Sequence, residues 1–465
     1  MRRFIILIMI LFSLSGCSLG QRTIRYDIAS LAKDHTIGIV SNPFSAAGSL
    51  LSRIKIFTTE TLWRMHLDFF CYPFLSSKIP PVSDKREYFN KQQFNKWLDG
   101  KTGGPVKGNV RILLSGESFF PVLEQNIQKA EKYINISTYI FDNDQYGLFF
   151  ADLLKKKSKK ISVKVISDML GSVVAWEISD EKQGKSKGVS PDIFSYLTDN
   201  SDVRIRRSRN IWLASDHTKM IIIDGKKVFF GGMNIGNEYR YEWRDSMFEV
   251  TGDLTEKFQK VFNHSWYKYS FCGDLVSFFS NKFHYKKKNK DNGAKNFHIL
   301  RTTSYRHDIY NAQIEAARRA KNHIFVENPY IWNEAFLYEL CAARNRGVDV
   351  RVTIPGIFDA KTFSGINKRV ANTLLKYGVR IFIYPGVSHI KAASFDDWVC
   401  FGTANFDDLS FHKNNEINLA TSDPEFVQKF KQDILINGQI QSSELKDFFQ
   451  IELTDWITHG LKDYF

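Results

Sequence analysis

Two short stretches of the sequence place a histidine, a lysine and an aspartate at the same spacing. They are Asp216-His217-Thr218-Lys219, followed by Asp224, and Ser388-His389-Ile390-Lys391, followed by Asp396. On an extended strand, residues i and i+2 point to the same face, so each histidine projects together with its lysine. Each stretch therefore sets an imidazole beside a fixed positive charge.

The correspondence continues downstream of both stretches. Gly231-Gly232-Met233-Asn234 follows the first and Gly402-Thr403-Ala404-Asn405 follows the second. Asp245 comes eleven residues after Asn234, and Glu416 comes eleven residues after Asn405. A pattern of His, Lys, Asn and acid that recurs at nearly constant spacing argues against the alternative of two surface histidines in unrelated strands.

These residue types suit the cleavage of a phosphodiester. The reaction needs a nucleophile, neutralisation of the phosphoryl oxygens and a proton for the leaving alkoxide, and histidine can serve as nucleophile or proton donor near neutral pH. With one histidine from each half, one attacks phosphorus to give a covalent phosphohistidine while the other protonates the leaving oxygen. Lys219, Lys391, Asn234 and Asn405 can hold the non-bridging oxygens. No metal or other cofactor is then needed.

The repeated pattern resembles the HxKxxxxD signature of the phospholipase D superfamily, over about residues 108–420. The resemblance implies that Asp245 and Glu416 orient the catalytic imidazoles, often across the interface between the two halves. It also implies His217 as the nucleophile and His389 as the general acid.

The aspartates that give the signature its name are expected, by the same resemblance, to be structural and to bond the backbone near the strand ends. They are Asp224 and Asp396. Ordinary turn formation is the leading interpretation for Asp224, because Gly225 follows it.

The substrate class is left more open than the reaction. The segment 402–411, Gly-Thr-Ala-Asn-Phe-Asp-Asp-Leu-Ser-Phe, is similar to the GTANxDxRSF segment of bacterial cardiolipin synthases, with Leu409 in place of the Arg. This similarity favours a phospholipid substrate, with cleavage or transfer of a phosphatidyl group. The alternatives are an exported nuclease of the same mechanism, with nucleic acid as its partner, and a lipid-binding lipoprotein without turnover. Headgroup, acceptor and oligomeric state stay open.

Helical and extended patterns alternate along both halves. In the first half the sequence predicts strands at 110–114, 134–141, 161–168 and 203–206, with helices at 119–132 and 147–157. In the second half it predicts helices at 310–321 and 334–346, with strands at 324–330 and 348–354. The pattern indicates an α/β fold of two similar lobes, each a mainly parallel mixed sheet flanked by helices, with the active site at the lobe interface.

The length of 465 residues fits two lobes with additional segments. We divide the chain into a lipoprotein signal peptide (1–16), an N-terminal extension (17–107), a first lobe (108–281), a basic linker (282–296) and a second lobe (297–465). Residues 50–74 mix apolar, aromatic and basic side chains, which suits either packing on a neighbouring domain, the interpretation we favour, or a membrane interface.

The first residues predict export. A basic start, Met1-Arg2-Arg3, is followed by an apolar run at 4–12 that is short for a permanent membrane span. Leu14-Ser15-Gly16-Cys17 resembles a bacterial lipobox, which implies that Cys17 is lipidated and anchors the protein to a membrane. The protein is then a lipoprotein facing the periplasm or the cell exterior, in the outer membrane if the cell has one. An uncleaved signal anchor and a simple secretory signal are the alternatives.

Composition adds limits of its own. A hydrophobic content of 43% excludes a disordered chain. The net charge of +14 suits phosphate-bearing partners such as anionic lipid or nucleic acid, or else reflects a Lys-rich composition. A basic cluster, Arg204, Arg206, Arg207 and Arg209, precedes the first motif. The cysteines beyond the lipobox, Cys71, Cys272, Cys341 and Cys400, show no metal-ligand spacing, and free thiols are expected.

Overall fold

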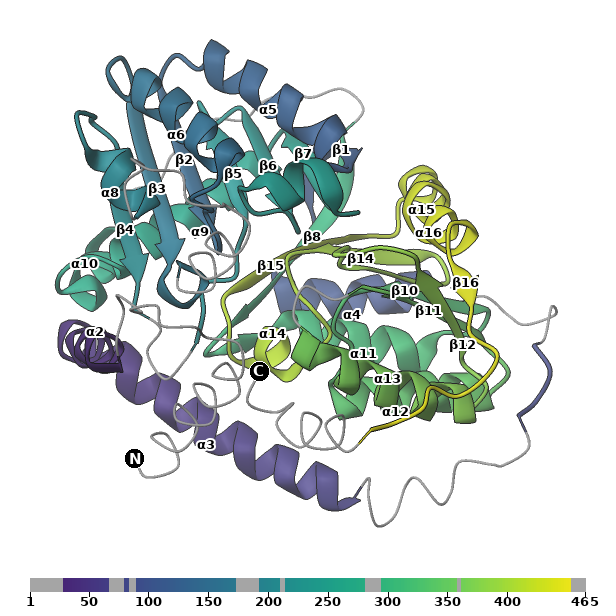
Figure 1. Ribbon diagram of the computed structural model, residues 1–465. Helices are drawn as coiled ribbons and strands as arrows, with labels where there is room; N and C mark the ends of the chain where they lie inside the picture. The colour runs from purple at the N-terminus through teal and green to yellow at the C-terminus, as the bar shows by residue number, and fades with distance from the viewer. Residues whose placement is uncertain are drawn as a thin grey trace.

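The computed structural model describes residues 28–66, 79–82, 89–172, 192–209, 214–280, 294–357 and 361–452. Within these residues two α/β lobes lie side by side and share one continuous mixed sheet (Figure 1). The predicted signal peptide, the lipobox Cys17, Cys71 and most of the basic linker lie outside the described residues.

The first lobe is built from seven strands of the described chain and the helices that flank them. The strands are β1 (Val106–Leu114), β2 (Tyr133–Thr138), β3 (Ser162–Asp168), β4 (Arg204–Ser208), β5 (Met220–Ile223), β6 (Lys227–Gly231) and β7 (Ser246–Thr251). The helices are α5 (Gly116–Lys129), α6 (Gln145–Ser158), α8 (Ile193–Thr198), η4 (Glu238–Glu242), α9 (Leu254–Lys268) and α10 (Gly273–Ser280). Helix α5 buries Phe119, Phe120, Leu123 and Ile127, the apolar face that its sequence periodicity predicts.

The second lobe repeats this order with additional short elements. Its strands are β8 (Lys295–Thr303), β9 (Arg306–His307), β10 (His323–Glu327), β11 (Asp349–Pro355), β12 (Arg380–Tyr384), β13 (Ala392–Phe395), β14 (Trp398–Gly402), β15 (Glu416–Thr421) and β16 (Ser443–Glu444). Its helices are α11 (Asp308–Arg319), α12 (Glu334–Asn345), α13 (Lys361–Lys376), α14 (Asp408–His412), α15 (Pro424–Phe430), η5 (Lys431–Ile436) and α16 (Asn437–Ile440).

The α/β fold of two similar lobes is confirmed, but parallel pairing takes a smaller share of the sheet than expected. Parallel neighbours are β2 with β3, β3 with β4, β10 with β11, and β11 with β12. The other pairings of the described strands are antiparallel, including β5–β6–β7 and β13–β14–β15 next to the motifs. The sequence prediction followed the helix-connected strands, and these hairpin strands are too short to be read from periodicity alone.

The two lobes are joined by backbone pairing and by a shared apolar layer. Strand β1 of the first lobe pairs with β8 of the second, antiparallel, from Val106 opposite Phe297. Below this joint, Phe248 of β7 stacks against Phe401 of β14 with ring centroids 4.3 Å apart, and Phe430 of α15 packs on Phe401. Burial of aromatic side chains from both lobes in one layer fixes the lobes relative to each other.

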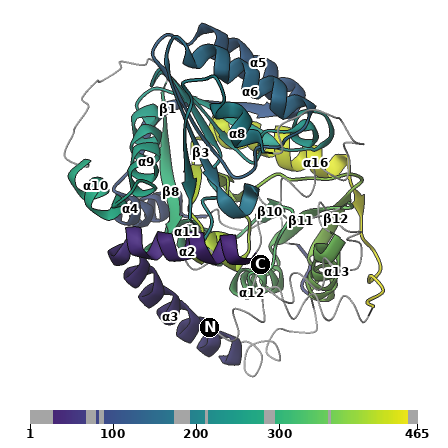
Figure 2. The same cartoon turned by 60° about the vertical axis from the view of Figure 1, so that its left-hand side comes forward.

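The N-terminal extension contributes three described helices, α2 (Ile28–Ser41), α3 (Pro43–His66) and α4 (Lys91–Thr102). Helix α4 buries Phe94 and Leu98 in the core of the second lobe. Helices α2 and α3 lie outside both lobes (Figures 1 and 2). Packing of α3 is partial, because Ala46 is buried while Leu51 is 68% exposed. No described helix combines the length and the hydropathy required to cross a bilayer.

Each motif aspartate closes a hairpin against the start of the preceding central strand. Asp224, between β5 and β6, accepts the backbone N–H groups of Glu131, Lys132 and Tyr133 at 2.7–3.0 Å. Asp396, between β13 and β14, accepts those of residues 321, 322 and 323 at 2.8–2.9 Å. Both residues adopt a left-handed backbone, with φ of 55° and 48°. Both aspartates therefore act as structural braces, which tie the hairpin that follows each histidine to the start of β2 or β10.

Candidate active site

The histidine of each motif is held by the backbone of the other lobe. The backbone N–H of His217 donates to the carbonyl oxygen of Asn415 at 3.0 Å, and that of His389 donates to the carbonyl of Arg244 at 2.8 Å. Short parallel bridges, Asp216 with Asn415 and Arg244 with Ser388, make these contacts part of the sheet structure. The two motifs therefore meet at the interface between the lobes.

The imidazole rings are bonded across the same interface. His217 Nδ1 lies 2.8 Å from Glu416 Oε1, and His389 Nδ1 lies 2.6 Å from Asp245 Oδ2. The histidines are only 9% and 5% exposed, and both acids are fully buried. A carboxylate at Nδ1 fixes the orientation of each ring and directs Nε2, the other ring nitrogen, away from the acid.

The motif lysines project beside their histidines, as the i, i+2 spacing predicts. Lys219 Nζ donates to the carbonyl oxygen of His217 at 3.0 Å, and Lys391 Nζ donates to that of His389 at 2.8 Å. The lysines are 1% and 2% exposed. Two ammonium groups are thus buried at the lobe interface, in matching positions.

The charges at the interface act on one another. Burial lowers the pKa of His217 well below its ordinary value, and the charges of Lys219, Lys391 and His389 lower it further. Burial also lowers the pKa of Lys219 to about 7, although Glu416 opposes this shift. Because groups from the second motif act on His217, both half-sites belong to one centre.

The two asparagines of the pattern have different surroundings. Asn234 Oδ1 accepts the backbone N–H of Ile140 at 3.0 Å, and its Nδ2 donates to the Tyr239 hydroxyl at 2.9 Å. Asn405 is 6% exposed, and its Oδ1 has no hydrogen-bond partner among the described residues. The amide of Asn234 is therefore engaged within its own lobe, and that of Asn405 is the less committed of the two.

A family model described as "Cardiolipin synthase, PLD-like domain" matches residues 123–266 and 313–435, one segment in each lobe. The matched segments make up more than half of the chain and contain both histidine–lysine pairs. The chain belongs to this family. It is accordingly an enzyme of the phospholipase D type.

Individual relatives extend the similarity beyond these segments. A probable cardiolipin synthase of Bacillus subtilis (strain 168) is 28% identical over 438 residues, which are 90% of this chain and 83% of that protein. Cardiolipin synthase 1 of Bacillus anthracis is 30% identical over 381 residues, 77% of this chain and 71% of that protein. The crystal structure of phosphatidylserine synthase from Haemophilus influenzae Rd KW20 aligns with a TM-score of 0.61 at 12% identity, over 79% of this chain and 97% of that one. This structural likeness confirms the fold.

In this phospholipase D-like fold, two hydroxyl groups that the sequence reasoning missed support Glu416. Thr403 Oγ1 donates to Glu416 Oε2 at 2.5 Å, and Ser410 Oγ donates to Oε1 at 2.9 Å. Burial raises the pKa of Glu416, and these hydrogen bonds together with the charge of Lys219 oppose the rise. Both hydroxyls lie within the 402–411 segment, so the signal for them was present in the sequence.

Aromatic rings flank both imidazoles. The ring of Tyr139 meets that of His217 edge to face, with centroids 4.8 Å apart, and also lies 5.2 Å from Lys219 Nζ. Trp243 packs against His389 with centroids 5.3 Å apart. Trp243 stands two residues before Asp245, whereas nothing in the sequence around Tyr139 marks it as a site residue. These rings remove water from the imidazoles and so maintain their burial.

A second buried charge pair crosses the interface beside His389. Arg244 Nε donates to Glu327 Oε1 at 2.9 Å, and Ser388 Oγ donates to the same oxygen at 2.7 Å. Arg244 is 7% exposed and Glu327 fully buried. Because Arg244 also accepts the backbone N–H of His389 through its carbonyl, this pair helps to set the position of the second motif.

The predicted basic cluster ahead of the first motif is largely used in internal contacts. The Arg206 guanidinium stacks 4.3 Å from the Trp266 ring, and Arg207 pairs with Asp192 at 3.2 Å. Arg209 Nη1 donates to Ser41 Oγ at 2.7 Å, which ties α2 to the first lobe. The cluster therefore serves packing between elements.

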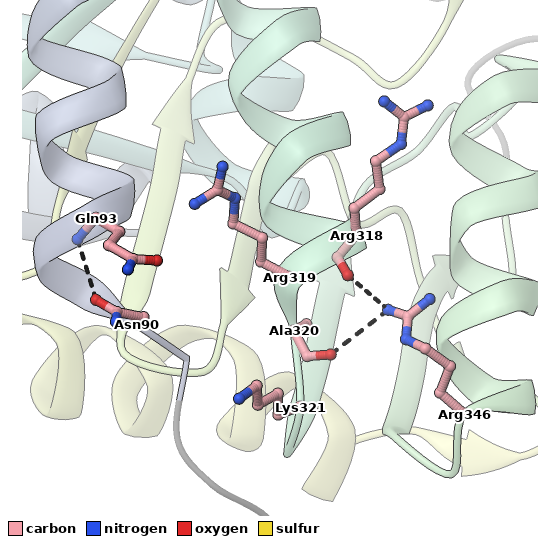
Figure 3. A pocket seen from close by; sticks show the side chains of 7 residues that line it. All are labelled: Asn90, Gln93, Arg318, Arg319, Ala320, Lys321 and Arg346. Carbon is pink, nitrogen blue, oxygen red and sulfur yellow. Dashed lines mark hydrogen bonds between the residues drawn. The ribbon is translucent and has the colours of Figure 1, made fainter.

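A concave basic surface also lies away from the histidines, between the end of α11 and the start of β10 (Figure 3). It contains Arg318, Arg319, Lys321 and Arg346, but Arg346 Nη2 donates to the carbonyl oxygens of Ala317 and Ala320 and so caps α11. In the first lobe, Lys157 Nζ bonds the carbonyl of Ala130 in the same way, at 2.8 Å. Arg346 and Lys157 thus cap matching helices in the two lobes, while Arg318 and Arg319 pair with Glu339 and Glu315.

We predict that Arg244→Ala destabilises the fold by about 3–5 kcal/mol, because it leaves Glu327 buried without its countercharge. Urea unfolding of the purified protein measures the change. The double variant Arg244→Met/Glu327→Met is expected to recover most of the loss, since it removes both charges together. A double variant as unstable as Arg244→Ala would contradict this account of the pair.

Proposed function

We propose that this chain is a phosphatidyltransferase of the cardiolipin synthase type, which acts on phospholipids through a covalent phosphohistidine. The observation that carries the proposal is the reciprocal pairing of His217 with Glu416 and of His389 with Asp245 across one buried interface. Two imidazoles fixed in this way, each next to a buried lysine, supply the groups that a two-step displacement at phosphorus requires.

In the first step His217 Nε2 attacks the phosphorus of a phospholipid. The lowered pKa of His217 keeps the ring neutral and its electron pair available. A nitrogen–phosphorus bond forms as the phosphorus–oxygen bond to the leaving headgroup breaks, and His389 gives its proton to that alkoxide. Glu416 stabilises the positive charge that develops on the His217 ring.

In the second step the acceptor hydroxyl loses its proton to His389 and its oxygen attacks phosphorus. The nitrogen–phosphorus bond breaks and His217 returns to its starting state, so both histidines are regenerated. A lipid glycerol hydroxyl as acceptor gives a two-phosphatidyl product, which is the reaction that the names of the relatives suggest. Water as acceptor would give phosphatidate.

The buried lysines and Asn405 are suited to the charge that moves during both steps. Lys219 and Lys391 each place an ammonium group beside a histidine carbonyl, and these charges can neutralise the non-bridging phosphoryl oxygens. The amide of Asn405 can add a further donor. Asn234 contributes indirectly, by holding the loop at Ile140 and the Tyr239 ring.

The proposal is tested with purified protein and vesicles of labelled phosphatidylglycerol, with plasmid DNA treated in parallel. We expect a product with two phosphatidyl groups together with free glycerol, and only slow release of phosphatidate. Cleavage of DNA without any lipid product would instead establish the nuclease alternative. Binding of vesicles without turnover of lipid or DNA would leave a lipid-binding protein.

Each catalytic histidine is expected to be required. His217→Ala and His389→Ala should each lower the turnover of phosphatidylglycerol by at least about 10³-fold, because neither step proceeds without both rings. The matched control is His298→Ala, which removes a buried histidine paired with a carboxylate, Asp99, on α4. This control should keep kcat within a few-fold of the wild type, and a near-normal rate in either site variant would remove that histidine from the mechanism.

The ionisation of Lys219 predicts the basic limb of the pH profile. Because its pKa is lowered to about 7, the free enzyme loses this ammonium charge above pH 7, and kcat/KM should fall there. Lys219→Arg keeps the charge at higher pH, so in this variant the fall should move upward even if the maximal rate is reduced. An unchanged basic limb would show that another group controls it.

We further propose, from the lipobox resemblance, that the protein is an exported lipoprotein anchored through Cys17. The anchor would hold the enzyme close to phospholipid headgroups. Cells that express the wild type in the presence of a labelled fatty acid should yield a labelled protein, and Cys17→Ser should abolish the label. A wild type without label would reject the anchor and leave the enzymatic proposal intact.

A further inference from the structure

A cavity lies where the α2–α3 pair covers the end of the first lobe. Three cationic residues line it, Arg209, Lys268 and Lys413, and the rest of its lining is mainly hydroxyl and amide side chains without a carboxylate. Its volume of ≈ 40 Å³ suits one small polar group rather than a macromolecule. A lining of this chemistry is complementary to an anion.

Positive charge accumulates behind this lining. Burial lowers the pKa of Lys268, and the charge of Arg301 lowers it further. Burial likewise lowers the pKa of Arg301, and the pKa of His264 falls to about 4 through burial and the charges of Lys268 and Arg301. Among the described residues no hydrogen bond or ion pair reaches Lys268 Nζ. A partly buried cation without such a partner either loses its proton or is stabilised by a bound anion.

The carboxylates nearest to these cations are already committed. Asp216 accepts the Tyr269 hydroxyl at 2.6 Å and the Thr218 hydroxyl at 2.5 Å. Asp274 accepts the backbone N–H groups of Phe44 and Ser45, both at 3.0 Å, at the start of α3. These acids weaken the positive field without forming ion pairs in the cavity.

Exposed apolar side chains lie next to this polar cavity. Phe44 is 75% exposed and precedes the lining residue Ser45, and Tyr305, itself a lining residue, is 60% exposed. Leu51 on α3, at 68%, and Leu275 on α10, at 56%, extend the apolar surface, and α3 contacts α10. Figures 1 and 2 show α2, α3 and α10 on the same side of the molecule. Free phosphate gains nothing from such side chains, and the aliphatic Leu51 and Leu275 offer nucleic-acid bases no ring to stack on, whereas acyl chains can pack on all of them.

We propose that this cavity binds the phosphate of a phospholipid whose acyl chains lie on the exposed apolar side chains of α3 and α10. This lipid site is separate from the two histidines, although it lies close behind one of them. Asn415 and Tyr269 line the cavity, the Asn415 carbonyl accepts the backbone N–H of His217, and Tyr269 bonds Asp216. A lipid held here keeps the enzyme on the bilayer that supplies its substrate.

The test measures binding in the His217→Ala background, where turnover is blocked. Calorimetric titration with dihexanoylphosphatidylglycerol, below its micellar concentration, should find two lipid molecules per chain, one at the histidines and one in the cavity. Adding Lys268→Met should abolish binding of the lipid in the cavity or weaken its affinity by about tenfold, since a hydrogen bond to a charged group is lost. If the proposed reaction is wrong and the histidines bind no lipid, the titration should find one lipid per chain in His217→Ala and none once Lys268→Met is added.

Controls separate the cavity from general effects of charge. Lys321→Met, in the basic surface of Figure 3, removes the same charge elsewhere and should leave the titration unchanged. Lys268→Met should not lower the thermal midpoint of the lipid-free protein, because it removes an unpaired buried charge. Should the Lys268→Met variant fail to fold, Lys413→Met at the same cavity is expected to weaken lipid binding there in its place.

A second variant tests whether the ligand is a lipid. Phe44→Ser should weaken the cavity's affinity for the short-chain lipid several-fold and leave its affinity for inorganic phosphate as it was. Unchanged lipid binding in Lys268→Met would overturn the proposal. Equal affinity for inorganic phosphate and for lipid, with no effect of Phe44→Ser, would overturn the lipid assignment and leave a site for free anions.

Discussion

The structure depends on the exchange of hydrogen bonds between the lobes at the two histidines. Each ring and each histidine N–H is held by the opposite lobe, so neither half-site is complete within its own lobe. The β1–β8 pairing and the layer around Phe248 and Phe401 keep the lobes in register. A small separation of the lobes would break both carboxylate–imidazole bonds together, and this explains why so much aromatic surface is used at the joint.

The two half-sites match in plan and differ in detail. A Cβ at Gly232 would lie 2.1 Å from Asp245 Oδ1, so the first lobe needs glycine at this position beside its shorter acid. The second lobe has Thr403 there, and its hydroxyl bonds the longer Glu416. Glu416 thus accepts from two hydroxyl groups, whereas Asp245, besides its bond to His389, accepts the backbone N–H of Ser246. Unequal support of the two imidazoles is what a division into nucleophile and proton carrier requires.

The parts that the sequence predicted are those governed by local spacing. Lys219 lies beside His217 as their spacing predicted, although both residues precede β5 (Met220–Ile223), and the helix expected at 310–321 runs from Asp308 to Arg319. The Arg244–Glu327 pair joins residues 83 positions apart, and neither side chain is unusual in its local context. Antiparallel pairing next to the motifs was missed for the same reason, because register is set by partners distant in sequence.

The paired lysines leave positive charge at the interface that, on the proposed function, the phosphate of the substrate balances. Lys219 and Lys391 are buried near one another, and each charge disfavours the other, which adds to the lowering of the Lys219 pKa. An empty site at neutral pH can relieve this repulsion by releasing a proton from Lys219. A bound phosphodiester supplies the missing negative charge, restores the proton and recovers the full electrostatic attraction. On the proposed function, the cost of burying two like charges is offset when substrate binds, and this would favour anionic phosphoryl groups over neutral lipids.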